Sequence, residues 1–152
     1  MLWPTSDLVA VSWLLSIDWP DPVPGVATTL PEKTDWNTDL FIQVTTIGGG
    51  IDNYLPIRTP VIQVDAFAKA STSSTKPQWG LANHACEVII AASFGAQSYS
   101  GDLQLPGTFS SVRVTGVSVV TEPRRRMNDI QALARYQMDI EIPYLVKEME
   151  YE

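Results

Sequence analysis

The sequence contains one cysteine, Cys86, and one histidine, His84, among 152 residues. A single cysteine excludes an internal disulfide and any metal site built from several thiolates. With one imidazole in the chain, a Ser-His-Asp or Cys-His catalytic arrangement would have to use His84. The spacing of the aspartates also lacks the pattern of a calcium-binding loop. We therefore expect no enzymatic activity, no cofactor and no metal.

Basic residues are in deficit as well, with 10 Lys and Arg against 17 Asp and Glu and a net charge of −7. This balance argues against a protein that grips nucleic acid through its phosphates. Long hydrophobic runs are absent too, since the apolar segment Leu8 to Ile17 is well short of the about 20 residues that span a bilayer. The N-terminus lacks the basic residues of a secretory signal. We expect no membrane partner and no targeting segment.

The residues that are present predict one domain over positions 1–152, because 45% of them are hydrophobic and a chain of this length buries a sizeable core. Capping side chains at Thr5 and Ser6 predict a first helix from Ser6 to Ile17. Prolines then end it. A second helix is predicted from Gly80 to Ser93. The stripes expected to be buried are Leu8, Val11, Leu15 and the adjacent Leu14 in the first helix, and Leu81, Ala85, Val88, Ile89 and Ala92 in the second.

Alternating apolar residues predict the strands. The last of them, from Arg135 to Tyr144, turns Tyr136 and Met138 to one side and Gln137 to the other. Two helices cannot cover both faces of such a sheet. We therefore expect an α+β single domain with a mainly antiparallel sheet of about five strands, both helices on one face and long loops. The predicted strands are Val26–Leu30, Leu40–Ile47, Val61–Ala68, Ser110–Thr121 and the one beginning at Arg135.

Three consecutive glycines, Gly48, Gly49 and Gly50, follow a predicted strand, where many proteins bind a phosphate. Here Pro56 and Pro60 enforce extended backbone, no helix opens and no lysine follows. We interpret residues 48–59 as a flexible connection between two strands. Residues 69–78 and 122–134 are the other segments expected to be mobile or to make contacts with other subunits.

The isolated chemical groups have ordinary structural interpretations. His84 falls on the expected solvent side of the second helix, and Cys86 is turned away from it. Asp139 and Glu141 share one face of the last strand, which suits either acid-base chemistry or a wet sheet face. Nothing else in the sequence supplies a pocket around them. We therefore assign no catalytic residue.

The one basic cluster is Arg124, Arg125 and Arg126. It is either a solvated loop tip or an arm that pairs with an acidic surface on a neighbour, because arginine forms bidentate contacts with carboxylates. The sequence leaves both interpretations open.

Several segments together resemble the tail-terminator proteins of long-tailed bacteriophages that infect actinobacteria. In chain order they are "MLWPTSDLVAVSWL", "GVATTLP", "FIQVTTIGGGIDNYLPIRTPVIQVDAFA", "KPQWGLANHACEVI" and, later, "TEPRRRMND". The resemblance covers most of the chain up to about Ala92. It lies in the order of the segments, since none of them is a catalytic signature.

The resemblance implies a structural virion protein that forms a six-membered ring on the last ring of the tail tube, stops its growth and joins the head-side connector. It would be located at the tail-neck junction, and in the host cytoplasm during assembly. DNA would pass through the lumen without specific binding. A head-tail connector or stopper is the main alternative, and a small-ligand-binding enzyme is a remote one.

Two sets of residues follow as hypotheses from this ring. Carboxylates on the lumen wall would repel DNA, whereas loops would contact neighbouring subunits. The expected contact residues are Gly48, Gly49, Gly50, Tyr54, Arg124, Arg125 and Arg126, and the expected lumen residues are Asp65, Asp139 and Glu141.

Overall fold

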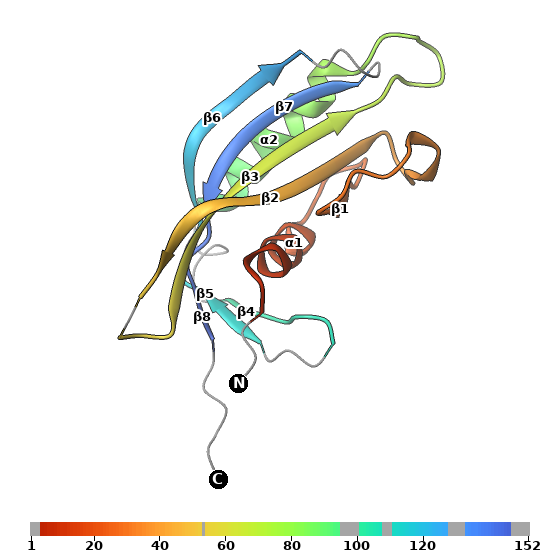
Figure 1. Ribbon diagram of the computed structural model, residues 1–152. Helices are drawn as coiled ribbons and strands as arrows, with labels where there is room; N and C mark the ends of the chain where they lie inside the picture. Colours follow the sequence, from red (N-terminus) through yellow and green to blue (C-terminus); the bar gives the residue numbers. More distant parts are fainter. Residues whose placement is uncertain (1–3, 53, 95–100, 108–110, 128–132, 147–152) are drawn as a thin grey trace.

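The computed structural model describes residues 4–52, 54–94, 101–107, 111–127 and 133–146. Within these ranges two α-helices lie against one sheet of eight strands (Figure 1). The elements in chain order are α1 (Ser6–Ser16), β1 (Gly25–Ala27), the short 3-10 helix η1 (Lys33–Asp35), β2 (Leu40–Ile51), β3 (Ile57–Ala68), α2 (Trp79–Ser93), β4 (Gly101–Leu103), β5 (Val112–Val114), β6 (Ser118–Arg126), β7 (Ala134–Glu141) and β8 (Tyr144–Val146).

Strand β3 is the centre of the sheet. It pairs antiparallel with β2 along one side and, along the other, with β7 and then β8. Beyond β7 lies β6, and beyond β8 lie β5 and β4, while β1 pairs parallel with the outer side of β2. The predicted α+β class with a mainly antiparallel sheet is confirmed, and the sheet curls around the helices (Figure 1).

Alternate positions of the central strands face both helices and form the core. Ile42 on β2, Val64 on β3 and Met138 on β7 are at most 1% exposed. They belong to the same buried cluster as Leu14 of α1 and Ile89 of α2. The helices therefore cover one face of the sheet, as expected, and the residues between these positions point to the other face.

Helix α1 begins as predicted, with the Thr5 hydroxyl accepting a hydrogen bond from the Leu8 amide at 3.2 Å. The predicted buried stripe was wrong apart from Leu14, because Leu15 is 56% exposed and Leu8 and Val11 are only partly covered. The helix is apolar on all sides, so its period alone did not select the inner face. The residues that it buries are Val9, Ala10, Trp13 and Leu14.

The predicted bounds of α2 are confirmed to within one residue. Ala85 and Ile89 are buried as expected, and so is Cys86. Leu81, Val88 and Ala92 are only partly buried instead.

The long strand expected at Ser110–Thr121 is not formed. Its first part is β5, which pairs with β8, and its second part begins β6, which pairs with β7. Between them the Thr115 amide donates to the Pro143 carbonyl at 3.0 Å. Pro143 has no N–H to donate and separates β7 from β8. The chain therefore changes partners on both sides of this point, which the apolar pattern did not reveal.

The glycine triplet lies inside a strand and not in a flexible loop, which corrects the prediction for residues 48–59. The ladder between β2 and β3 shifts register between Thr46 and Gly48 and then continues to Ile51. Gly49 has a φ of 121°, and a Cβ there would overlap the Thr59 carbonyl oxygen and lie 2.6 Å from the Pro60 Cα. Glycine is needed here for a close approach of two strands.

The other two predicted loops are also more ordered than expected. In residues 69–78, Ala70 and Pro77 form a bridge. In residues 122–134, positions 122–126 belong to β6, and 128–132 lie outside the described residues. Strand β6 lies at the edge of the sheet, with Pro123 and two register irregularities along its length.

Candidate functional site

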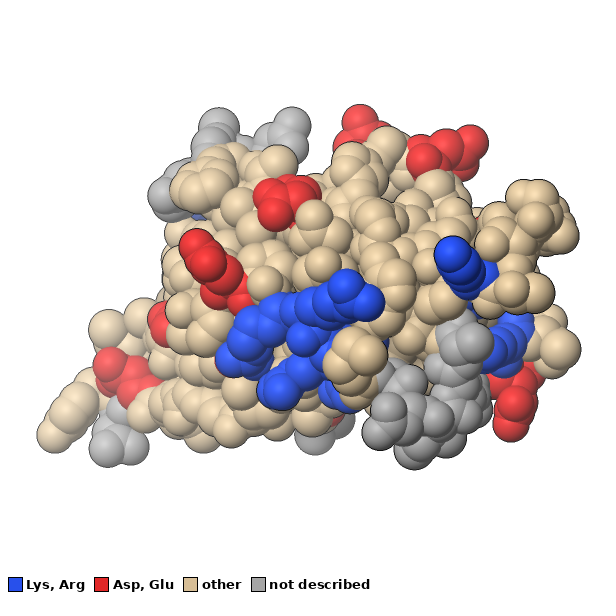
Figure 2. All heavy atoms as spheres, turned by 90° about the horizontal axis from the view of Figure 1, so that it is seen from above, with Lys and Arg blue, Asp and Glu red and all other residues tan. Residues whose placement is uncertain are grey.

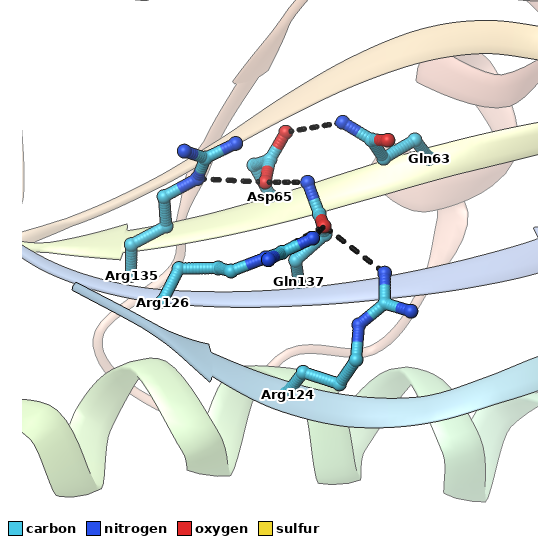
Figure 3. Close-up of polar contacts among 6 residues, drawn as sticks. All are labelled: Gln63, Asp65, Arg124, Arg126, Arg135 and Gln137. Carbon is cyan, nitrogen blue, oxygen red and sulfur yellow. Dashed lines mark hydrogen bonds and ion pairs between the residues drawn. The ribbon is translucent and has the colours of Figure 1, made fainter. Parts of the chain in front are cut away.

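The face of the sheet that the helices leave open carries a network of polar side chains. Neighbouring strands bring these side chains together, because their register places Asp65 opposite Gln137 and Gln137 opposite Arg124. Figure 3 shows them converging from three strands. The members are Gln63 and Asp65 of β3, Arg135 and Gln137 of β7, and Arg124 and Arg126 of β6.

Asp65 is the anionic centre of this network and is 3% exposed. Its Oδ1 accepts from the Arg135 Nε at 2.9 Å and from the Gln137 Nε2 at 3.0 Å. Its Oδ2 accepts from the Gln63 Nε2 at 3.2 Å. A buried carboxylate requires such partners, and here a charged partner and two amides supply them.

Gln137, 4% exposed, connects Asp65 to two further arginines. Its Oε1 accepts from the Arg124 Nη2 at 3.0 Å and from the Arg126 Nε and Nη2 at 3.0 and 2.8 Å. One carbonyl oxygen thus orients two guanidinium groups whose residues are exposed. A guanidinium has five N–H donors, so both groups keep donors for an acceptor outside the chain.

The open face is therefore locally basic in an acidic protein. Arg124, Arg126 and Arg135 outnumber the one carboxylate, Asp65, to which the network is bonded. Figure 2 shows Lys and Arg side chains gathered in one large patch on the side seen from above. Such a patch suits a carboxylate or another anion.

The three consecutive arginines do not act as one arm. Because side chains alternate along a strand, Arg125 points to the helix side, where its guanidinium lies 3.9 Å from the centre of the Trp79 ring. Trp79 in turn meets Tyr136 edge to face at 6.2 Å. Arg125 is therefore engaged with α2, while Arg124 and Arg126 are on the open face.

The three carboxylates expected on an acidic lumen wall have different surroundings. The prediction for Asp65 was wrong, because this residue is buried and paired with Arg135 and does not present its charge on a surface. Asp139 and Glu141 are partly exposed on the open face, as the alternation predicted. The Asp139 amide donates to the Thr121 hydroxyl at 3.0 Å, whereas its Oδ1 is buried with no hydrogen-bond partner among the described residues.

The end of the β2–β3 hairpin is a second feature. Ile51, Tyr54 and Leu55 are 66%, 94% and 56% exposed. The Asp52 carboxylate accepts from the Tyr54 and Leu55 amides at 2.7 and 2.9 Å, and these backbone bonds lower the pKa of Asp52. The turn thus holds its apolar side chains in the solvent.

His84 and Cys86 do not form a pair. His84 is exposed on α2 as predicted, and Cys86 is buried in the core. Burial is the main cause that raises the pKa of the Cys86 thiol to about 12, with smaller contributions from the charges of Glu87 and Asp65. The thiol therefore remains protonated at neutral pH and is a poor nucleophile.

The described residues contain no group of three or more His, Cys, Asp and Glu side chains that could hold a metal ion. No helix in the described ranges is long and apolar enough to cross a membrane.

The alternation of the last strand placed Arg135 and Gln137 on one face, but their bonds to Asp65 were not foreseen. These bonds depend on the register between β3 and β7, which cannot be read from a single sequence. The predicted contact residues Gly48, Gly49 and Gly50 lie in β2 near the hairpin end, on a different part of the molecule from the arginine network (Figure 1).

No protein-family model matches the chain, and no curated protein matches it. A solved structure that carries no functional name is similar to this chain, with a TM-score of 0.46 and 17% sequence identity. The match covers 97% of this chain and 99% of that one.

Proposed function

We propose that this protein is a structural subunit of a phage tail: a tail terminator that closes into a ring on the end of the tail tube, stops its polymerisation and offers a joining surface to the head-side connector. The observation that carries the proposal is the ordered resemblance of its segments to that family. Those segments correspond to α1, β1, the β2–β3 hairpin and the first part of α2. The proposed role depends on surfaces and not on a chemical step.

Two surfaces support a role in assembly. The arginine network presents oriented guanidinium groups on the face that the helices leave open. The hairpin end presents exposed apolar side chains at Ile51, Tyr54 and Leu55. Exposed apolar residues in one place are typical of protein interaction sites, and tail-tube subunits that stack head to tail continue to add until a different surface stops them.

The test is the length of tails assembled without the protein. We expect overlong tubes by electron microscopy when the gene is removed, and tubes of uniform length when the purified protein is added back during assembly. Uniform tubes in its absence would contradict the proposal.

The same material distinguishes the alternatives. A terminator binds tail-tube protein, whereas a connector or stopper binds the portal-side protein, so pull-down with each partner separates the two. A thermal-shift screen with nucleotides tests the enzyme alternative, because a ligand at 100 times its Kd adds about 2.7 kcal/mol to the free energy of unfolding. We expect no shift.

A further inference from the structure

Arg124 and Arg126 carry positive charges that the described part of the chain does not neutralise. Arg135, the third arginine of the network, is paired with Asp65, whereas no ion pair within the described ranges includes Arg124 or Arg126. Both residues are exposed, and their side-chain hydrogen bonds go to the neutral amide of Gln137. The open face therefore keeps two positive charges at one place without a carboxylate to balance them.

The two guanidinium groups converge on one atom, the Gln137 Oε1. The Arg124 Nη2 lies 3.0 Å from this oxygen and the Arg126 Nη2 lies 2.8 Å from it, so the two nitrogens cannot be farther apart than the sum of these distances. Figure 3 shows both side chains reaching the amide from β6. A carboxylate has two oxygen atoms that each accept hydrogen bonds, so one carboxylate can bridge both groups.

The Gln137 amide is itself held in place. Its Nε2 donates to the Asp65 Oδ1 at 3.0 Å, and both residues are buried, with exposed fractions of 4% and 3%. This bond directs the Oε1 towards the arginines. The guanidinium groups are thus oriented before any ligand arrives, which reduces the side-chain entropy that is lost on binding.

The surroundings favour a single anionic group over a long polyanion. Asp139 and Glu141 lie on the same face of β7, two and four residues beyond Gln137. A strand advances about 3.3 Å per residue, so a nucleic acid running along β7 would meet these carboxylates within about 15 Å of the arginines. The net charge of −7 adds to this repulsion.

The residue next to Arg126 favours a protein as the source of this group. Met127 is 75% exposed and offers apolar surface that a protein segment can cover and a free anion cannot. An exposed ion pair alone contributes only about 0–1 kcal/mol, so lasting occupation of this site requires such additional contacts.

We propose that Arg124 and Arg126 together bind a Glu or Asp side chain of a partner protein, with an apolar residue of the same partner segment packing on Met127. Gln137 is the positioning residue of this site, because it orients both arginines. The inference deepens the proposed function and rests on it for the place of this partner, which would be a neighbour in the tail.

NMR titration of the full chain, labelled with ¹⁵N and with ¹³C in the methionine methyl groups, tests the site. The probe is the end-capped peptide Gly-Leu-Glu-Leu-Gly, and its counterpart has Gln in place of Glu. We expect the Nε–H signals of Arg124 and Arg126 and the methyl signal of Met127 to shift together and to saturate with the Glu peptide. The Gln peptide should bind about tenfold more weakly, because it offers no charged acceptor. Equal affinity for the two peptides would overturn the proposal.

Variants at exposed positions locate the binding. Arg124→Gln with Arg126→Gln should abolish the preference for the Glu peptide. Arg125→Gln is the matched control, since Arg125 lies over Trp79 on the helix side, and it should retain the preference. A preference that persists in the double variant, or that the control also loses, would contradict the site.

Gln137→Leu tests the orientation of the arginines. We expect the Arg124 and Arg126 Nε–H signals to move to the position of a free arginine side chain, and the Glu peptide to bind several-fold more weakly, while circular dichroism shows a folded chain. Unchanged arginine signals and unchanged affinity would contradict the role of Gln137.

Three further titrations test other occupants. Sodium phosphate should saturate the arginine signals only at a higher concentration than the Glu peptide, and a short DNA duplex should bind more weakly than the peptide. Dilution of the protein without peptide should leave the signals unchanged. Equal or tighter binding of phosphate or DNA would overturn a protein carboxylate as the ligand, and signals that move on dilution would assign the site to a second copy instead.

Failure of the site and failure of the proposed function give different results. If the site is wrong, the peptide titration fails, while removal of the gene still gives overlong tubes. If the terminator role is wrong, tubes are uniform without the protein, while the purified chain still prefers the Glu peptide.

Discussion

The Arg135 Nε lies 2.9 Å from the Asp65 Oδ1, in a pair whose carboxylate side chain is 4% exposed and whose guanidinium side chain is 30% exposed. The two residues are 70 positions apart and meet because β3 and β7 are neighbours. Breaking such a pair by removing one partner leaves the other partly desolvated.

We predict that Asp65→Ala lowers the free energy of unfolding by about 2–4 kcal/mol, because Arg135 and Gln137 both lose their acceptor. Urea denaturation followed by tryptophan fluorescence measures it. Asp139→Ala is the control, since its buried Oδ1 has no partner among the described residues, and we expect a much smaller change. Equal effects for the two variants would show that the network contributes little.

Gly48 and Gly49, which are adjacent in β2, provide a second prediction. Gly49→Ala should lower the free energy of unfolding by about 1–3 kcal/mol, because its φ is positive and a Cβ meets the Thr59 and Pro60 backbone. Gly48→Ala should change it by less than about 0.5 kcal/mol, since nothing lies within 4 Å of a Cβ there. Thermal melts of the two variants, run together, measure the difference. A flexible loop would tolerate both changes alike.

Cys86 should be inert to thiol reagents in the folded protein at pH 8 and reactive once urea unfolds it. The pKa of its thiol is raised from 9.0 to about 12. Because the folded state prefers the protonated thiol, this group contributes stability that is complete below pH 9.0 and is lost as the pH rises towards about 12. Reaction with a chromogenic disulfide, followed over time, measures the accessibility. Fast labelling at pH 8 without urea would contradict the burial.

The hairpin turn should depend on the ionisation of Asp52. Its pKa is lowered from 3.8 by the Tyr54 and Leu55 amides, so the turn is fully supported above pH 3.8 and weakens only as the pH falls through the lower folded value. In NMR titrations the Asp52 carboxyl and both amides should shift together, with a midpoint below 3.8. Asp52→Ala should raise the hydrogen exchange of both amides. Unchanged hydrogen exchange of the Tyr54 and Leu55 amides would contradict their hydrogen bonds to the Asp52 carboxylate.

Substitutions of the β6 arginines should have different effects on the two faces of the strand. In tail assembly, Arg124→Glu with Arg126→Glu should give overlong tubes, because the open face loses its oriented guanidinium groups. Arg125→Glu, on the helix side over Trp79, should give normal tubes. Electron microscopy measures tube length, and circular dichroism checks that each variant is folded. Tubes of normal length with the double variant would show that the open face is not a contact surface in tail assembly.

Local signals in the sequence were enough for the helices and the central strands. The Thr5 cap fixed the start of α1, and alternation identified the inner residues of β7. Which side of α1 faces inward depended on Trp13 fitting the core, because both sides are apolar. That choice is made by packing between distant segments, so periodicity could not reveal it.

The candidate site was harder to predict for the same reason. Single residues such as Tyr54 and Arg124 were identified from the sequence, but the partners that orient them were not. Gln137 orients Arg124 and Arg126 only because β7 lies between β3 and β6. A strand order of this kind is a property of the whole chain, and no short motif carries it.

The irregular ladder of β6 affects which contacts this edge of the sheet can make. Pro123 offers no N–H, and the two register shifts bend the strand out of a regular repeat. A strand of another molecule would meet an interrupted row of backbone donors and acceptors at this edge, which disfavours open-ended extension of the sheet. A partner at this edge would have to be recognised through side chains, and an assembly held together in that way can end at a fixed number of members.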